Sequence, residues 1–479
     1  MLKAVELVGE QRKTLTLSPE GPIQIKGTAG SGKTTVAIYR ACHLIDSHSD
    51  MFEPSKVAIF TFNKTLSAYL KALTQNFNSN DYSDIKVVNF HKWAYAFIEK
   101  NGIALRGKTI FGNQTQTLLR SILISTSRKS DSERILNKSI DFFCDEISWL
   151  KGKHILTLDE YVQTVRSGRG TSDRVLATDR PIIWQVFTKY NEELRRLGKY
   201  DFDDYALLCI EIIEKLGNSF VQPFTHLVVD EAQDLSKAQM TVLAKLVSKT
   251  TNSITVIADA AQRIYKSGFS WKEIGLNVTG GRTIEFKKNY RNTKQIAHAA
   301  LSLLESDDDS SEFTLAEAST REGEMPVIKQ CTDLNSERSF IIQRLKYLRQ
   351  HLPNDSICLL HRTTGGVTNA INNLQQNQIK CEKINSNATV NYLDNSVKVS
   401  TMQSVKGLEF DHVIIYDLTD NNLPISSGFS EPDDEIHITT ERRLLYTCMT
   451  RAAKTLLMTY SGVPSRYFAE INSSLIDEQ

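Results

Sequence analysis

The sequence lacks the features of a secreted, membrane-spanning or metal-centred protein. No apolar run approaches the roughly 20 residues that a helix needs to cross a bilayer. The N-terminal stretch MLKAVELVGEQRKTL has no apolar segment followed by a small-residue cleavage site. The seven cysteines are scattered, with no CxxC pair and no histidine cluster. This pattern argues against a zinc or iron–sulfur site and predicts reduced thiols in a cytoplasmic protein. The lack of a long apolar run predicts that the chain has no membrane partner.

The chain also lacks an excess of charge of either sign. Its 57 Lys and Arg residues against 56 Asp and Glu residues give a formal net charge of +1. A protein that binds nucleic acid through a uniformly basic surface would carry far more positive charge, so such a partner would need a local groove here. The length of 479 residues predicts two or three domains.

Short β-branched runs alternate with helical stretches along most of the chain. The runs are PIQIKG, KVAIFTF, THLVV, SITVIAD, SICLLHR, VKVST, HVIIYDL and TLLMTYS. Because they are continuously apolar rather than alternating, they indicate strands buried on both faces of parallel sheets. Alternation with helices then predicts an α/β fold with crossover connections.

One region breaks this pattern. Between about residues 96 and 200 the strand runs vanish, and segments such as RPIIWQVFTKYNEELRRLG carry one apolar stripe at helical spacing. We interpret this region as a helical insertion in the first α/β domain. The predicted parts are 1–95 and 201–285 for the first domain, 96–200 for the insertion and 286–479 for the second domain.

A phosphate-binding motif follows the first predicted strand. GTAGSGKTT fits GxxxxGK[ST] between the strand PIQIK and the helix TTVAIYRACHLI. Glycines let backbone N–H groups converge on phosphate, and the helix N-terminus attracts negative charge. Lys33 would approach the terminal phosphates and Thr34 would bind Mg²⁺; the alternative is a glycine-rich turn without a ligand. The predicted nucleotide-binding residues are Gly27, Thr28, Ala29, Gly30, Ser31, Gly32, Lys33, Thr34 and Thr35.

The run THLVVDEAQD ends a buried strand in three carboxylates. A solvated surface loop would explain an isolated acidic pentapeptide. Next to the upstream phosphate-binding motif, the carboxylates could bind Mg²⁺, because this ion is bound by one or two carboxylates together with phosphate oxygens. We therefore assign Asp230 to the metal and Glu231 to accepting a proton from the water that attacks the γ-phosphate.

Two arginines could stabilise the charge that develops during phosphoryl transfer. An arginine in that position contributes roughly 10³–10⁵ in rate. Arg291 in FKKNYRNTKQI and Arg451 in YTCMTRAAKTLL are the candidates. Either one could also be an ordinary surface arginine.

In their order along nearly the whole chain, these segments resemble the motifs of UvrD/Rep-type helicases of superfamily one. The resemblance implies two RecA-like P-loop domains with ATP and Mg²⁺ between them, and with arginine fingers from the second domain. It implies catalytic roles for Lys33, Asp230, Glu231, Gln262, Arg291 and Arg451. It adds Gln11 and Tyr290 at the adenine and Glu409 at the ribose.

The resemblance also implies contacts to DNA. These contacts would come from Phe62, Asn63, His91, Tyr265, Trp271 and Thr401. Stacking of a base on an aromatic ring contributes roughly 1–3 kcal/mol and tolerates any base sequence, which suits a motor. Core packing is the alternative for each aromatic residue, and a hydrogen-bonded structural role explains His91 equally well.

Several positions depart from the family pattern. Ala258 replaces a glycine before an aspartate, and Gln403 replaces a common histidine. Family members of full architecture carry a large insertion between segments matching CLLHR and VKVST, whereas the stretch 363–395 has room for one helix and one strand. The chain also ends shortly after SRYFAEI, so we expect no appended nuclease domain.

The expected function is that of an ATP-dependent DNA helicase acting on single-stranded and duplex-junction DNA. Movement from 3′ to 5′ and a role in DNA repair or anti-phage defence follow from the resemblance alone. One rival is an ATP-gated DNA-binding subunit that regulates a separate nuclease. The other is a non-catalytic binding module, which the retained ATP motifs disfavour.

Overall fold

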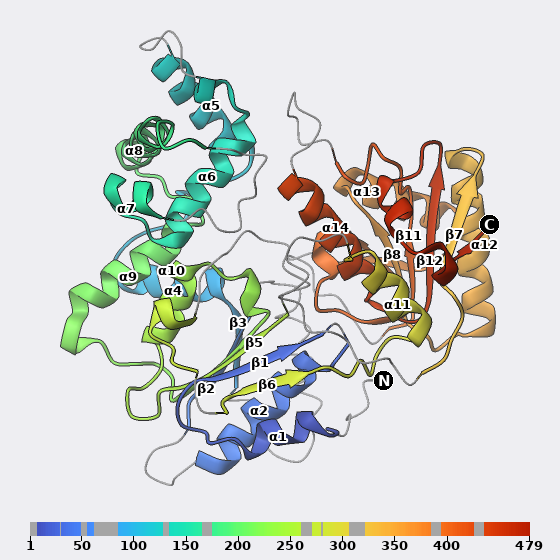
Figure 1. The fold of residues 1–479 in the computed structure, drawn as a ribbon, viewed down its shortest axis with the longest axis horizontal. Helices are drawn as coiled ribbons and strands as arrows, with labels where there is room; N and C mark the ends of the chain where they lie inside the picture. The colour runs from blue at the N-terminus through green and yellow to red at the C-terminus, as the bar shows by residue number, and fades with distance from the viewer. Residues whose placement is uncertain are drawn as a thin grey trace.

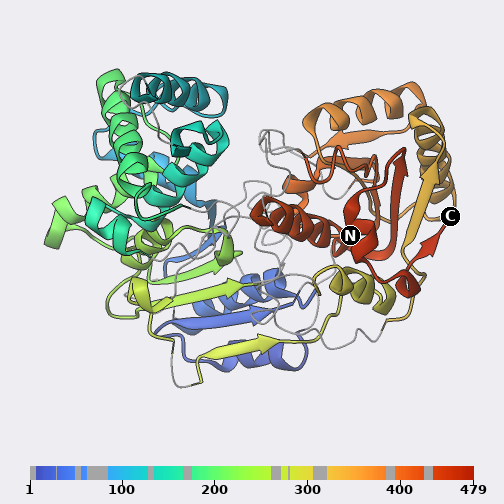
Figure 2. The same cartoon turned by 45° about the horizontal axis from the view of Figure 1, so that its top comes forward.

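The computed structural model shows two α/β parts side by side and a group of helices above the first (Figures 1 and 2). The structure describes residues 7–28, 30–48, 55–61, 85–127, 134–164, 175–259, 271–278, 281–305, 321–384, 394–425 and 435–479.

The first α/β part is built on a six-stranded sheet with the order β3-β2-β4-β5-β1-β6. Every pairing in it is parallel. Its strands are β1 (Ile23–Gly27), β2 (Val57–Thr61), β3 (Lys86–Asn89), β4 (His226–Asp230), β5 (Ser253–Ala258) and β6 (Thr283–Phe286). All residues of β2 and β4 are buried, as their continuous apolar runs predict for strands covered on both faces.

Helices cover both faces of this sheet. They are α1 (Glu10–Thr16), α2 (Lys33–His48), α4 (Phe90–Lys100), α9 (Asp204–Leu216) and α10 (Lys237–Lys245). The apolar side of α2 packs on one face, against β1 and β2. Helices α4, α9 and α10 form a separate apolar cluster on the other face.

Four helices between β3 and β4 form their own apolar cluster. They are α5 (Asn113–Ser127), α6 (Ile140–Lys153), α7 (Leu158–Gln163) and α8 (Arg180–Leu197). The buried stripe of α8 includes Ile183, Phe187, Tyr190 and Leu194. Helix α6 also packs against α9 and α10, which joins this helical group to the first sheet.

The second α/β part has a seven-stranded parallel sheet with the order β13-β7-β12-β11-β8-β10-β9. Its strands are β7 (Val327–Cys331), β8 (Ile357–His361), β9 (Cys381–Lys383), β10 (Val397–Thr401), β11 (Phe410–Ile415), β12 (Ala452–Ser461) and β13 (Asp477–Glu478). Its helices are α11 (Lys294–Ser302), α12 (Leu334–His351), α13 (Thr364–Gln376) and α14 (Glu435–Met449). Helices α11 and α14 share one apolar cluster, and α12 and α13 share another.

Short 3₁₀ helices fill several connections. They are η1 (Arg134–Asn137), η2 (Gly217–Ser219), η3 (Ala232–Asp234), η5 (Trp271–Ile274), η7 (Met402–Val405), η8 (Arg466–Glu470) and η9 (Ser473–Leu475). The predicted fold class is confirmed: two RecA-like parallel-sheet domains with a helical insertion in the first. The predicted helix and strand in the stretch 363–395 are also present, as α13 and β9. Within the described stretches, no helix is both long and apolar enough to cross a membrane.

Candidate active site

Three neighbouring strands of the first sheet, β4, β5 and β1, end at one edge of that sheet, and their ends carry the predicted ATP motifs. The phosphate loop follows β1, Asp230 ends β4, and Asp259 follows β5. Ligands of open α/β sheets bind at the carboxyl ends of strands, so this edge is the expected place for a nucleotide.

The glycines of the loop are required by its geometry. Gly30 and Gly32 have φ values of +73° and +81°, which residues with a Cβ rarely adopt. A Cβ at Gly32 would lie 2.5 Å from Nε2 of Gln11, and one at Gly27 would lie 2.7 Å from Oγ of Ser31. The loop backbone therefore forms a tight cradle. A simple glycine-rich turn would not require such close packing.

Lys33 begins α2 and lies inside this cradle. Its Nζ donates to the carbonyl oxygens of Gly27 (3.0 Å) and Thr28 (2.7 Å), and it forms an ion pair of 2.8 Å with Asp259. The ammonium therefore lies where the phosphates of a bound nucleotide would replace the carbonyl partners. Thr35 continues the helix and is half-buried.

Thr34 and Asp230 provide a pair of oxygen ligands. The Thr34 hydroxyl donates to Oδ2 of Asp230 over 3.0 Å. Burial and the neighbouring charge of Glu231 raise the pKa of Asp230 to about 7, although Thr34 and Lys33 oppose the shift. A divalent cation would favour the ionised carboxylate, and hard oxygen donors are what Mg²⁺ prefers. The two side chains fit the predicted Mg²⁺ site, with the remaining ligands left to water and phosphate.

Glu231 adopts a left-handed backbone conformation with φ of 54°, which is uncommon for a residue other than glycine. Its carboxylate accepts a hydrogen bond of 2.5 Å from Nε2 of Gln233. Burial acts to raise the pKa of Glu231, but the charges of Lys406, Lys33 and Arg451 outweigh it and hold the pKa below its usual value. The side chain is therefore ionised and able to accept a proton.

Lys406 is a site residue that the sequence analysis missed. It follows η7 in the second domain and reaches the carboxylates of the first. Its Nζ lies 2.5 Å from Oδ2 of Asp234 and 3.5 Å from Oε2 of Glu231, and all three side chains are buried. Its position in VKGLEF was visible in the sequence, but the contact spans 172 residues and depends on how the two domains meet.

The two predicted arginine fingers lie together on the second domain. Arg451, between α14 and β12, is buried, and its Nε donates to the Thr447 carbonyl over 2.9 Å. Burial and the nearby charge of Arg291 lower the pKa of Arg451 to about 10, so it stays charged at neutral pH. Arg291 forms an ion pair with Glu409 and donates to the Thr450 carbonyl over 3.4 Å.

The residues predicted at the base and ribose occupy the same neighbourhood. Gln11 Nε2 donates to the Ser31 carbonyl over 2.8 Å, which ties α1 to the phosphate loop. A Cβ at Gly9 would lie 3.8 Å from the Tyr290 hydroxyl, so Tyr290 stands beside the start of α1. Glu409 forms an ion pair with Arg291, which places it at the same cleft.

The predicted DNA contacts are more dispersed. His91, in the first turn of α4, has its ring 5.5 Å from that of Phe202. Trp271 begins η5 and packs against the core of the first domain. Thr401 ends β10, where its hydroxyl donates to Oγ of Ser404 over 3.0 Å. Five predicted site residues lie outside the described residues, namely Ala29, Phe62, Asn63, Gln262 and Tyr265.

Two exposed aromatic side chains near His91 had no assigned role. Phe111 is 62% exposed and Phe202 is 42% exposed, and their rings lie 5.9 Å apart. Phe202 lies just before α9, in the segment YDFDD at residues 200–204. Beneath this segment, buried Lys151 of α6 forms ion pairs of 2.7 Å with Asp201 and 2.6 Å with Asp204.

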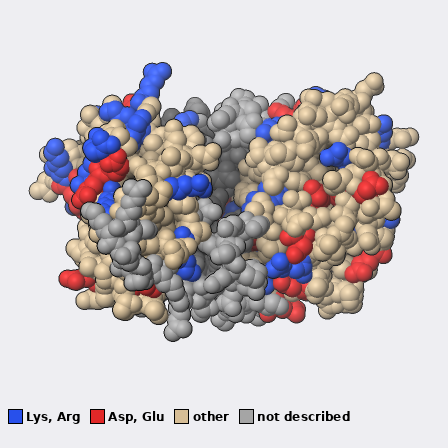
Figure 3. Space-filling model, turned by 90° about the horizontal axis from the view of Figure 1, so that it is seen from above, with Lys and Arg blue, Asp and Glu red and all other residues tan. Residues whose placement is uncertain are grey.

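The view from above shows Lys and Arg side chains on both the helical group and the second domain, and on each part Asp and Glu side chains are interspersed with them (Figure 3). This mixed surface agrees with the small net charge of +1. Among the residues that the structure describes, no cluster of three or more His, Cys, Asp or Glu side chains could hold a metal ion.

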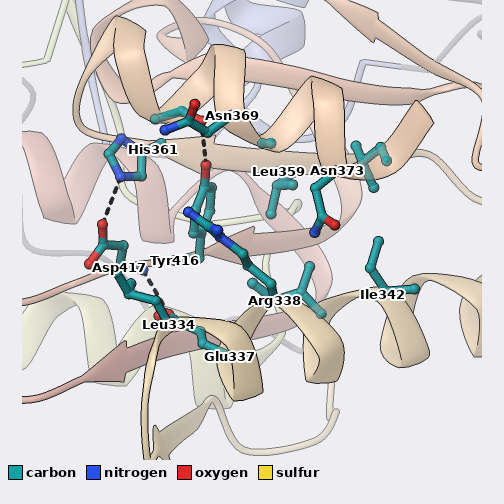
Figure 4. A pocket seen from close by; sticks show the side chains of 14 residues that line it. Leu334, Glu337, Arg338, Ile342, Leu359, His361, Asn369, Asn373, Tyr416 and Asp417 are labelled. Carbon is teal, nitrogen blue, oxygen red and sulfur yellow. Dashed lines mark hydrogen bonds and ion pairs between the residues drawn. The ribbon is translucent and has the colours of Figure 1, made fainter. Parts of the chain in front are cut away.

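A separate hollow lies in the second domain between α12 and α13 (Figure 4). It is found at the carboxyl ends of β8 and β11, where His361 Nε2 lies 3.2 Å from Oδ2 of Asp417. The Tyr416 hydroxyl donates to the Gly366 carbonyl over 2.7 Å. The residues assigned to ATP or DNA do not line this hollow.

Comparison with known proteins places this geometry in a family. The model of the UvrD/REP helicase N-terminal domain matches residues 7–271, and that of the UvrD-like helicase C-terminal domain matches 284–389 and 385–462. The ATP-dependent DNA helicase PcrA of Leuconostoc citreum is 24% identical over 72% of this chain and 45% of its own length. A probable DNA helicase II homolog of Mycoplasma capricolum is 22% identical over 75% of this chain and 49% of its own length.

The chain thus spans about half the length of these curated relatives. Among solved structures, the C-terminal domain of a possible DNA helicase from Lactobacillus plantarun matches 40% of this chain and 98% of its own length, with 20% identity and a TM-score of 0.30. The two family models together cover most of the chain, in the order that the motifs predict. The chain belongs to the UvrD/REP helicase family.

Proposed function

We propose that this chain hydrolyses ATP with Mg²⁺ and uses the reaction to move along single-stranded DNA and separate duplex DNA at a junction. The observation that carries the proposal is the seam between the domains. Glu231 and Asp234 of the first domain meet Lys406 of the second, and Arg451 lies close enough to affect the pKa of Glu231. A site completed by both domains ties hydrolysis to domain motion.

In this proposal the phosphate loop and Lys33 bind the phosphates, while Thr34 and Asp230 hold Mg²⁺. When bound, the metal would supply positive charge that offsets the negative charge of the terminal phosphates. Gln11 and Tyr290 border the base, and Glu409 the ribose. Lys33 exchanges the carbonyls of Gly27 and Thr28 for phosphate oxygens.

For the chemical step, Glu231 accepts a proton from water as the water oxygen bonds to the γ-phosphorus. The bond from that phosphorus to the ADP oxygen breaks, and the negative charge passes to ADP. Gln233 and Lys406 hold the Glu231 carboxylate, so its orientation is set before water arrives. Arg291 and Arg451 stabilise the charge on the phosphoryl oxygens.

For strand binding, we propose His91, Trp271 and Thr401 among the described residues and Phe62, Asn63 and Tyr265 beyond them. Gln262 would couple the γ-phosphate to that strand. Movement from 3′ to 5′ and service in DNA repair or anti-phage defence are proposed from family resemblance. The domain limits are proposed as 1–95 with 201–285, 96–200 and 286–479.

The test uses Lys33→Ala and Glu231→Gln, measured for ATP hydrolysis with and without single-stranded DNA. Loss of a general base typically lowers the rate by 10²–10⁴-fold. Lys454→Met is the matched control, because its ion pairs with Asp355 and Asp411 lie within the second domain. Wild-type hydrolysis by Glu231→Gln would show that the assignment of the base is wrong.

Strand displacement on duplexes with a 3′ or a 5′ single-stranded tail then tests the motor. The proposal expects displacement from the 3′-tailed substrate only, and only with hydrolysable ATP. DNA-stimulated hydrolysis without displacement of either duplex would favour the other candidate, an ATP-gated DNA-binding subunit that acts on a separate nuclease.

A further inference from the structure

Two buried asparagine side chains lie between the phosphate loop and the arginine finger. The segment from Asn289 to Asn292 follows β6 and precedes α11, so it runs from the first domain to the second. Asn289 is 3% exposed and Asn292 is fully buried. Buried amide groups are nearly always hydrogen-bonded, so the contacts of these two side chains define how each amide is oriented.

On one side this segment contacts the phosphate loop. The Tyr290 N–H donates to the Gly30 carbonyl over 2.9 Å. A Cβ at Gly30 would lie 2.3 Å from Oδ1 of Asn289 and 2.9 Å from Oδ1 of Asn292. The loop backbone therefore packs closely against the amide pair, and the hydrogen bond from Tyr290 to Gly30 ties it to the segment that carries both amides.

On the other side, Asn292 holds the backbone around Arg451. Its Nδ2 donates to the carbonyl of Thr450 over 3.0 Å and to the carbonyl of Ala452 over 2.5 Å. These are the residues immediately before and after the arginine. Both hydrogens of the amide are used, which a serine hydroxyl with its single donor could not reproduce.

Asn289 sets the orientation of the Asn292 amide. Its Nδ2 donates to Oδ1 of Asn292 over 2.8 Å, so the Asn292 nitrogen faces the two carbonyls. The Oδ1 of Asn289 accepts from the backbone N–H groups of Arg291 (2.9 Å) and Asn292 (3.1 Å). The same turn therefore places Arg291, whose Nη1 also donates to the Thr450 carbonyl over 3.4 Å.

We propose that Asn292 is a positioning residue for Arg451, and that it makes the placement of this arginine depend on the conformation of the phosphate loop. The inference rests on the proposed ATP hydrolysis and assigns Asn292 no contact with the nucleotide. Binding of phosphates would act on Gly30, the amide pair would follow, and the carbonyls flanking Arg451 would move with it. Displacement of a catalytic group by about 1 Å can cost about 10²-fold in rate.

The experiment compares Asn292→Ala and Asn292→Ser with the wild-type chain in DNA-stimulated ATP hydrolysis. We expect Asn292→Ala to lower kcat by roughly 10–100-fold, since Arg451 is misplaced but present. The KM for ATP should change by less than about threefold, because Asn292 does not touch the substrate. Asn292→Ser keeps one hydrogen-bond donor, so its kcat should lie between that of the wild type and that of Asn292→Ala.

Two further measurements separate positioning from loss of stability. Leu345→Ala removes a fully buried side chain from α12, in the apolar cluster that is separate from that of α14. This control should lower the melting temperature at least as much as Asn292→Ala while leaving kcat within about threefold of wild type. In the Arg451→Ala background, Asn292→Ala should have little further effect, because residues that act as a unit are not additive.

The proposed positioning role is wrong if the wild-type chain hydrolyses ATP and the kcat of Asn292→Ala lies within threefold of the wild-type kcat. An equal loss from Asn292→Ala in the wild-type and Arg451→Ala backgrounds would also overturn it. If the wild-type chain itself hydrolyses no ATP with DNA present, it is the proposed function that fails, which is a different result.

Discussion

Replacing Lys406 by methionine removes a cation that joins the second domain to the proposed catalytic carboxylates of the first. The Lys406 Nζ lies 2.5 Å from Oδ2 of Asp234 and 3.5 Å from Oε2 of Glu231. Each of these three side chains is at most 6% exposed. Methionine keeps most of the side-chain volume, so the change is close to a pure loss of charge. Two buried carboxylates of the first domain are then left without their shared partner from the second.

The magnitude follows from these distances. With an effective dielectric constant of about 20, the Coulomb attractions are roughly 7 kcal/mol over 2.5 Å and 5 kcal/mol over 3.5 Å. Desolvation of the buried charges offsets most of this attraction. Removing one partner of a buried pair typically costs about 3–5 kcal/mol. If that cost falls on closure of the cleft, kcat/KM for ATP decreases by about 10²-fold or more.

The assay is a double-mutant cycle on DNA-stimulated ATP hydrolysis with Lys406→Met and Asp234→Asn. In the wild-type background, Asp234→Asn should lower kcat/KM, because it removes the nearer partner of Lys406. In the Lys406→Met background the same change should raise kcat/KM, because it neutralises an unpaired buried carboxylate. Independent, additive losses in both backgrounds would refute the reasoning.

Three other predictions concern stability. Gly366→Ala should lower the free energy of unfolding by about 1–3 kcal/mol, because its Cβ would lie 1.9 Å from Nδ1 of the hydrogen-bonded His361 ring. Gly365→Ala, whose Cβ meets only one atom at 4.0 Å in the same helix, should instead raise it by about 0.5–1 kcal/mol in denaturant titrations. Burial and the charge of Asp201 raise the pKa of Asp203 to about 7, so the folded chain binds a proton that the unfolded chain releases near pH 4. Stability therefore falls between pH 4 and pH 7, and Asp203→Asn should flatten this fall by up to about 4 kcal/mol when unfolding is followed across that range.

Much of the fold could be predicted because its signals are local. Continuous apolar runs such as THLVV and SITVIAD became the central strands β4 and β5, since only buried parallel strands need both faces apolar. The short strands β3, β6 and β13 were not predicted. They have two to four residues and each has exposed positions, so they resemble loops until a neighbouring strand pairs with them.

The candidate site shows the same division between local and distant information. GTAGSGKTT and DEAQD are each readable as one segment, because one loop or strand end carries the needed groups. The partners of those groups come from elsewhere. Asp259 pairs with Lys33 across 226 residues and Lys406 with Asp234 across 172 residues. Their contacts depend on strand order and on the seam, which no periodicity or spacing in the sequence encodes.

The charges at the seam suggest why hydrolysis would open it. On the first side, Asp230, Glu231 and Asp234 are buried carboxylates; on the second, Lys406 and the two arginine fingers bring positive charge to them. In the proposed reaction, the γ-phosphate would add negative charge facing Arg291 and Arg451 before hydrolysis, and closure would bury matched charges. Once phosphate leaves, that negative charge would be lost, whereas Arg291 keeps its ion pair with Glu409 and Lys406 keeps its two carboxylate partners. Because the attraction across the cleft would then be weaker, we expect the equilibrium to shift towards an open cleft, which would be the force-bearing step of the proposed motor.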